Sequence, residues 1–202
     1  FKQKTAYEIR NCDWSSDVCS SDLERVRGDL LPEQRMKVAF RKPWEIQLDW
    51  ETVHEGRRVY WCACQHDGTV QVYPGGLAGR TVGILSFSLD SSILKRDTNY
   101  TPKDAGFGSL VSMVYNAVSG NAQTGALTET SVNGQRAWEF EMSAFTHPRL
   151  AKATVAVSET TGLPVRLVGW NAAGELTEKY SWYDTEVNPS LSDADFPTGY
   201  AE

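Results

Sequence analysis

The sequence has no apolar run that approaches the ~20 residues needed to cross a bilayer, so we expect no membrane-spanning segment. It also has no run of lysine and arginine. The 20 basic side chains are spread among 26 acidic ones, and the net charge is −6. Nucleic-acid-binding proteins instead carry a basic patch or stripe. The composition therefore argues against a nucleic-acid partner.

Cysteine and histidine are scarce, with four and three copies. Cys12 and Cys19 lie in the atypical first 23 residues, which leaves Cys62 and Cys64, too few for a disulfide framework. Cys62, Cys64 and His66 stand at alternate positions, so on a strand they could share one face as metal ligands. A fourth ligand is not obvious, and a Cys62–Cys64 disulfide would need unusual geometry. We therefore interpret them as small buried cysteines beside a turn histidine, and expect no metal and no cofactor.

Recognisable catalytic motifs are also missing: there is no nucleophile elbow, phosphate loop or paired metal motif. Glu139 and Glu141 share one face of a predicted strand and could form an acid pair. The opposite face carries the apolar side chains of Trp138, Phe140 and Met142, so the two glutamates indicate an ordinary solvated side. His54 and His147 stand in turn-like contexts, where we expect them to be solvated. The sequence thus predicts no catalytic residues and no enzyme.

The first 23 residues stand apart from the rest of the chain. They contain a near-repeat of Ser-Ser-Asp without strand or helix periodicity, and no basic start followed by an apolar core, so they do not form a signal peptide. The segment closely resembles a translated short-read sequencing adapter; a native disordered arm is the alternative. We expect residues 1–23 to be non-native and disordered, and to be removable without changing the melting temperature. Residues 24–202 then form one domain whose natural start is lost.

Two strands follow, over Met36–Phe40 and Trp44–Trp50. In both, apolar and polar side chains alternate with a period of two, as on a strand with one apolar face. Pro43, which has no N–H to donate, marks the break between them. One side of the second strand forms an apolar wall made of Trp44, Ile46, Leu48 and Trp50.

Further strand and turn signals continue to the end of the chain. Asp67-Gly68 and Asn133-Gly134 are typical of tight hairpin turns, because glycine and asparagine adopt positive φ readily. Gly75, Gly76 and Gly79 indicate a flexible connection. The pattern predicts about ten short strands, and their short connections favour antiparallel neighbours in a meander.

One segment changes to a helical period. Thr101 and Pro102 are a typical helix start, and Gly120-Asn121 a typical end. Between them the apolar residues recur at three- and four-residue spacing: Phe107, Leu110, Val111, Val114, Tyr115 and Val118. A sheet of ten strands must curl or be covered, and one such helix cannot cover it flat. We therefore predict a mainly β fold, a strongly curved antiparallel sheet forming an unclosed half-barrel, with one amphipathic lid helix.

Three segments resemble a known fold family. They are KVAFRKPWEIQLDW (37–50), HDGTVQVYPGGLAGRTVGILSFSLD (66–90) and TGLPVRLVGWNAAGELTEKYSWYDTEVNPSLSDADF (161–196). With them the chain resembles the periplasmic lipoprotein-carrier superfamily over nearly all of residues 24–200, and more closely a bacterial family of unknown function on that fold. The superfamily usually begins with a helix and a first strand, which are largely missing here.

The resemblance implies an unclosed antiparallel barrel with a helical lid over an apolar concave face that binds acyl chains. It implies a non-enzymatic protein of the periplasm or cell envelope that binds or carries a lipid, a lipoprotein acyl chain or a similar apolar ligand. The alternative is an envelope sensor or scaffold that binds a protein partner. The candidate ligand-binding residues are Trp44, Ile46, Leu48, Trp50, Leu110, Val111 and Val114. The competing interpretation is that these side chains only fill a core.

Overall fold

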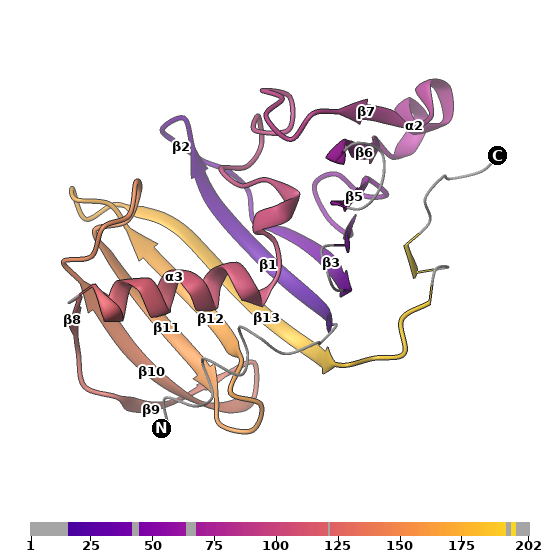
Figure 1. Ribbon diagram of the computed structural model, residues 1–202. Coiled ribbons are helices and arrows are strands. Elements are labelled where there is room, and N and C mark those ends of the chain that lie inside the picture. The colour runs from indigo at the N-terminus through magenta and orange to yellow at the C-terminus, as the bar shows by residue number, and fades with distance from the viewer. Residues whose placement is uncertain (1–15, 42–44, 64–67, 121, 193–194, 197–202) are drawn as a thin grey trace. The chain divides into compact units, whose positions relative to one another are not determined.

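The computed structural model describes residues 16–41, 45–63, 68–120, 122–192 and 195–196 (Figure 1). Thirteen strands form one antiparallel sheet that does not close. The predicted fold class, mainly β with an unclosed antiparallel sheet, is confirmed. The described residues contain three more strands than the ten expected, and a second α-helix, α2 (Gly76–Val82), beside the predicted one.

The chain divides into two compact units. We call the first the α3 unit; it contains Asp22–Leu30 and Phe107–Tyr183. The second, the α2 unit, contains Leu31–Gly106 and the described residues of 13–21 and 184–202. Each unit is described by itself.

The α2 unit holds five strands that pair in chain order: β3 (Gln34–Arg41), β4 (Glu45–Trp50), β5 (Arg58–Cys62), β6 (Val70–Tyr73) and β7 (Leu85–Phe87). Ile46 of β4 lies opposite Phe40 on one side and Trp61 on the other. Directly opposed residues share a face, so the apolar side predicted for β4 continues across the neighbouring strands. The predicted antiparallel meander is confirmed here.

The other face of β4 carries polar side chains, as the alternation predicts, but it is buried as well. Glu45 and Gln47 are only 6% and 3% exposed. Glu45 is held by the Tyr60 hydroxyl, which donates to Oε1 over 2.9 Å, and by Arg41 Nη2, 2.6 Å from Oε2. Phe196 packs on Tyr60 and its ring lies 4.7 Å from the Arg41 guanidinium. Hydrogen-bonded partners thus allow polar residues at positions that alternation alone assigns to solvent.

Helix α2 (Gly76–Val82) occupies the stretch predicted to be a flexible connection. It packs on β6 at Gly79, where an added Cβ would lie 2.5 Å from Cζ of Tyr73. Close approach of the helix to the tyrosine ring therefore requires glycine at this position. The glycines that suggested flexibility instead permit tight packing.

The α3 unit contains four long strands in chain order: β10 (Gln135–Ser143), β11 (Lys152–Ser158), β12 (Pro164–Trp170) and β13 (Leu176–Val187, which runs past its end). The short strands β8 (Gln123–Thr124) and β9 (Thr128–Val132) both pair with β10. Asn133 and Gly134 have φ of 50° and 79°, as the predicted hairpin turn requires. Helix α3 (Phe107–Ser119) lies across one face of these strands (Figure 1).

The predicted helix over residues 101–118 is two elements. The first is a short 3-10 helix, η2 (Pro102–Asp104), and the second is α3. The predicted start is confirmed, because the Asp104 carboxylate accepts the Thr101 N–H over 2.9 Å and the Thr101 hydroxyl over 2.7 Å. Gly106, with φ of 90°, stands between the two helices. A residue in that conformation cannot continue a right-handed helix, so the periodicity is interrupted there.

The expectation that residues 1–23 lack regular structure is wrong for Ser16–Leu23. These residues form the first part of strand β1 (Ser16–Val26), which is followed by the short β2 (Asp29–Leu30). Buried residues do alternate along β1, but two of the four are polar: Val18, Ser20, Glu24 and Val26. Serine and glutamate on the buried side hide the strand from a hydropathy pattern. Residues 1–15 lie outside the described part of the chain.

Candidate functional site

The strand residues predicted to contact a ligand lie in the α2 unit. Ile46 and Leu48 are 0% and 8% exposed, and Trp50 is half-buried, with its Nε1–H donating to Gln34 Oε1 over 2.7 Å. The 3-10 helix η2 packs against β4 and β5. These side chains are therefore covered by protein. Trp44, the fourth member of the predicted wall, lies outside the described residues.

The predicted helix residues lie in the α3 unit, on α3. Leu110 is buried, whereas Val111 and Val114 are half-buried. They are therefore described apart from the strand residues of the α2 unit, and their role as ligand contacts stays a prediction. Within the α3 unit, the environment of the helix gives a more definite site.

Helix α3 carries no charged residue and shows an apolar side wider than the surface it buries. Phe107, Leu110 and Ala117 are buried, and the Phe107 ring meets Trp182 of β13 edge-on at 5.7 Å between centroids. The adjoining Tyr115 and Val118 are 45% and 49% exposed. An amphipathic helix normally shows charged or polar residues next to its buried stripe. The sheet therefore covers only part of the apolar surface of α3.

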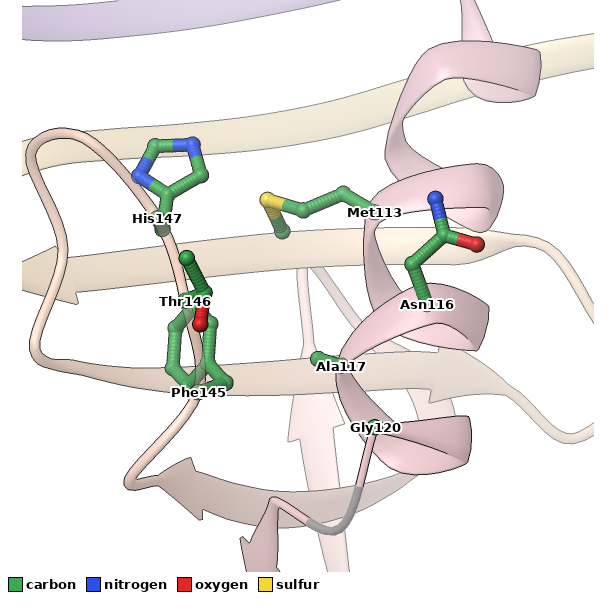
Figure 2. Close-up of a pocket in the computed structure, with 7 residues that line it drawn as sticks. All are labelled: Met113, Asn116, Ala117, Gly120, Phe145, Thr146 and His147. Carbon is green, nitrogen blue, oxygen red and sulfur yellow. The ribbon is translucent and has the colours of Figure 1, made fainter.

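A pocket opens beside this helix, with a volume of about 330 Å³ (Figure 2). One wall is the second half of α3, and the other is the loop between β10 and β11. The Met113 side chain extends from the helix toward the loop that carries His147 (Figure 2). The lining residues are Met113, Asn116, Ala117, Gly120, Phe145, Thr146 and His147. The pocket thus combines apolar side chains from both walls with three polar groups.

The loop wall is held to the sheet at two points. Leu150, only 2% exposed, sits above Gly169 of β12, where an added Cβ would lie 2.6 Å from Leu150 Cδ2. Arg149 Nη2 lies 3.3 Å from Oε2 of Glu178, a carboxylate on β13 with no exposed surface. Loss of Arg149 would leave the buried Glu178 carboxylate unpaired, which is costly. The ion pair and the Leu150 contact together therefore fix the loop. The pocket therefore has one anchored wall and one helical wall.

His147 organises the turn that leads to these anchors. Its Nδ1 accepts the backbone N–H of Leu150 over 3.1 Å and that of Arg149 over 3.3 Å. Burial, followed by the positive charge of Arg149, lowers the pKa of His147 below 6.5. The neutral ring is the form that can accept these bonds. The expectation that His147 is solvated is wrong, because the ring is half-buried and part of the pocket wall.

A second polar cluster lies in the α2 unit around Asp97. Its carboxylate is 3.4 Å from Arg57 Nη1, 3.2 Å from Arg96 Nε and 3.5 Å from His54 Nε2. Burial and the nearby Arg57 lower the pKa of His54. Burial raises the pKa of Asp97, but Arg96 and Arg57 outweigh this effect, so the pKa of Asp97 is lowered overall. These groups satisfy one another in charge. We assign the cluster a structural role in tying the β4–β5 turn to the segment around residue 97.

The structure also describes Cys62 and the paired glutamates, which the sequence raised as alternative sites. Cys62 is buried and disulfide-bonded, and a disulfide sulfur is no thiolate ligand for a metal. Cys64 and His66 lie outside the described residues. Glu139 pairs with Arg166, and Glu141 Oε2 lies 2.7 Å from Lys152 Nζ. The glutamates thus form ion pairs across the sheet, as expected for its solvated face.

The described residues contain no group of three or more His, Cys, Asp and Glu side chains placed to hold a metal ion. None of their helices has both the length and the apolar character needed to cross a bilayer.

Comparison with known structures shows related folds at low sequence identity. An uncharacterized conserved protein from Thermus thermophilus matches at a TM-score of 0.53 and 10% identity, over 96% of this chain and 89% of that one. The Pseudomonas aeruginosa MucA/MucB complex matches at 0.54 and 12%, over 97% of this chain and 59% of that one. This chain thus corresponds to somewhat more than half of that longer relative. At these identities the matches show the fold.

The structures matched also include a LolA superfamily protein from Nitrosomonas europaea, at a TM-score of 0.44 and 13% identity, over 96% of this chain and 95% of that one. The structures matched thus include a protein of the superfamily that the sequence resembles. No curated protein matches the sequence. A family model described as "Protein of unknown function (DUF1571)" matches residues 19–200. Because this match spans most of the sequence, the chain belongs to the DUF1571 family.

Proposed function

We propose that this protein binds an acyl chain, from a lipid or a lipoprotein, in the pocket between α3 and the β10–β11 loop, and that it acts by binding rather than by catalysis. The observation that carries the proposal is the pocket itself, whose two walls present Met113, Ala117 and Phe145 to one another. Burial of apolar chain surface would supply the affinity, about 0.8 kcal/mol per methylene. In keeping with the carrier-like fold, we place the protein in the periplasm or cell envelope.

The size of the pocket supports a single chain as ligand. Small-molecule sites have volumes of about 300–1,000 Å³. At about 330 Å³ this pocket is at the lower end of that range. Methionine is an adaptable pocket wall, because its unbranched thioether can follow different chain shapes. Ile46 and Leu48 of the α2 unit would act as supporting core in this scheme.

A second candidate function is capture of an extended protein segment. Strand β9 (Thr128–Val132) pairs with β10, and no other strand in the described part of the chain pairs with β9. Such an edge can accept an added strand from a partner. In this reading the protein is an envelope sensor or scaffold. Protection of the β9 amides by a partner, with no acyl ligand bound, would favour it.

Titration of the delipidated protein with a fluorescent fatty-acid probe tests the proposed function. We expect saturable binding, and we expect Met113→Trp to weaken it at least tenfold by filling the pocket. Val118→Trp is the matched control, since Val118 is on the same helix, is 49% exposed and does not line the pocket. Absence of saturable binding to the unmodified protein, or equal effects of the two variants, would contradict the proposal.

A further inference from the structure

The hydrogen bonds of His147 determine where its ring proton lies. Nδ1 accepts two backbone N–H groups, from Arg149 and Leu150. In a neutral imidazole one nitrogen accepts and the other carries the proton. Nε2 must therefore bear the hydrogen, and it is a donor. The turn that anchors the loop thus also fixes the tautomer of the ring.

His147 is one of the residues that line the pocket, and the Met113 side chain extends from α3 toward the loop that carries it (Figure 2). Within the described part of the chain, no side chain or backbone group forms a hydrogen bond or ion pair with Nε2. Water can satisfy this donor in the empty pocket, so a ligand that displaces the water must supply an acceptor to avoid the cost of an unpaired donor. A ligand in the pocket can gain a hydrogen bond here by offering an oxygen.

The surroundings favour an oxygen acceptor over a positive group. Arg149 lies two residues away, and its charge acts on the His147 ring strongly enough to lower the pKa of the ring. Thr146 and Asn116, which line the same pocket, add a hydroxyl and an amide that can also donate. Helix α3, the opposite wall, carries neither acidic nor basic side chains. The polar part of the pocket is therefore rich in donors and carries no negative charge of its own.

We propose that the pocket selects hydrocarbon chains whose head group offers a carbonyl or carboxylate oxygen over chains whose head group offers none, and that His147 is the specificity-determining residue, donating from Nε2 to that oxygen. This inference rests on the proposed function and specifies its ligand. The chain lies along Met113, Ala117 and Phe145, and the oxygen lies at the His147 end. A free fatty acid and the ester-linked chain of a lipid or lipoprotein share this chemistry.

Calorimetric titration at pH 7.5 with three probes that share one chain length compares a carboxylate, an ester and a head group without an acceptor oxygen. The probes are dodecanoate, methyl dodecanoate and dodecyltrimethylammonium, all below their aggregation limits. We expect dodecanoate to bind at least tenfold more tightly than the ammonium probe, which has no acceptor. A tenfold ratio corresponds to about 1.4 kcal/mol, the strength of one good hydrogen bond. An ester that binds as tightly as the acid identifies ester-linked chains as suitable ligands, and a weaker ester identifies the free acid.

Two variants separate the role of Nε2 as a donor to the ligand from the role of Nδ1 as an acceptor in the turn. In His147→Asn the side-chain oxygen can replace Nδ1 as acceptor of the turn bonds, but nothing replaces Nε2. In His147→Gln the amide can reach the Nε2 position, but the turn acceptor is lost. We expect the asparagine variant to keep the unfolding midpoint of the parent and to reduce the dodecanoate-to-ammonium ratio to threefold or less. We expect the glutamine variant to lower the midpoint and to keep more of the ratio.

The outcomes distinguish this inference from the proposed function. Equal binding of the three probes, or an asparagine variant with the full ratio, would overturn the role of His147 and leave chain binding intact. Failure of every probe to bind the unmodified protein would overturn the proposed function itself.

Discussion

Gly169 shows how one missing side chain shapes the candidate site. An added Cβ at this position would lie 2.6 Å from Leu150 Cδ2 and 3.2 Å from Glu178 Cγ. Leu150 anchors the loop wall of the pocket, and Glu178 pairs with Arg149 in the same loop. The glycine therefore holds the sheet and the loop at the distance that the pocket needs.

We predict that Gly169→Ala destabilises the protein by about 1–3 kcal/mol, the usual cost of overpacking a core. Urea unfolding would measure it as a lower midpoint with an unchanged slope. The matched control is Gly108→Ala on α3, where an added Cβ has no atom within 4 Å. Alanine should be neutral or stabilising there, by up to ~1 kcal/mol, because it favours the helix. An unchanged midpoint for Gly169→Ala would show that the packing of Leu150 does not depend on the missing side chain at Gly169.

We predict that the loop of residues 145–150 loosens at acidic pH. The pKa of His147 is lowered in the folded state, so the unfolded state binds more protons below pH 6.5. The stability contributed by the neutral ring is present above pH 6.5 and is lost as the pH falls toward the folded-state pKa. Amide hydrogen exchange of Arg149 and Leu150 between pH 7.5 and 5.5, corrected for intrinsic rates, would measure it.

The charged groups near His147 are Arg149 on its own loop and Glu178 on β13, which pairs with Arg149. His54 titrates in the same direction in the α2 unit, so global unfolding would mix the two. Exchange at the two amides separates them, and His147→Asn should abolish the pH effect there. Protection that stays constant with pH in the unmodified protein would contradict the prediction.

At the scale of elements, α3 is the wall of the pocket that we expect to move. Its apolar side is only partly covered, and Gly106 and Gly120 flank the helix. An element with few buried contacts opens more easily than a core strand. We therefore expect the helix, and not the anchored loop, to move when a ligand enters.

We predict that Met113→Asp weakens acyl-probe binding at least tenfold, because Met113 lines the pocket and an aspartate there would place a charge against the apolar chain. The free energy of unfolding should fall by less than about 1 kcal/mol, since Met113 is half-buried and a charge can still reach water. Probe titration and urea unfolding on the same variant test both parts. Ser112→Asp, on the preceding residue of the helix, is the control and should leave binding within twofold. If Met113→Asp unfolds the protein, α3 is a core element and not a lid.

Most elements could be predicted from local patterns. The strands of the α2 and α3 units show alternating side chains or favourable turns, and Thr101 marks the start of η2. Helix α2 could not be predicted in this way, because its glycines serve contact with Tyr73 and not chain flexibility. Burial of the polar side of β4 could not be predicted either, since Glu45 is satisfied by Arg41 of β3 and Tyr60 of β5, and these contacts form only when the strands pair.

The candidate site was predictable only in part. The sequence indicated α3 and its apolar residues, but not the loop wall of Phe145 and His147. That wall arises from tertiary contacts: Leu150 on Gly169 and Arg149 on Glu178 join residues 19 and 29 positions apart. The local signal that could have pointed to the site is Glu178, which alternates with the apolar Leu176 and Tyr180 along β13.

At the scale of the whole molecule, the first strand bears on where the folded chain begins. The adapter hypothesis predicts that deleting residues 1–23 leaves the melting temperature unchanged. Strand β1 includes Ser16–Leu23, and Val18 and Ser20 are each 2% exposed. We therefore predict that the deletion lowers the melting temperature by several degrees, through loss of buried apolar surface and strand hydrogen bonds. A melting temperature within error of the full chain would support the adapter hypothesis.

The central claim is that an acyl chain binds in the pocket beside α3. The chain has three methionines, and each reports on a different place: Met113 lines the pocket, Met142 is buried in β10 and Met36 is buried in β3 of the α2 unit. Titration with dodecanoate, followed by NMR of ¹³C-labelled methionine methyl groups, would read all three at once. The account predicts a saturable shift of the Met113 signal that exceeds the shift of Met36 at least threefold. A saturable shift confined to Met36, or no shift of Met113 at saturating ligand, would contradict it.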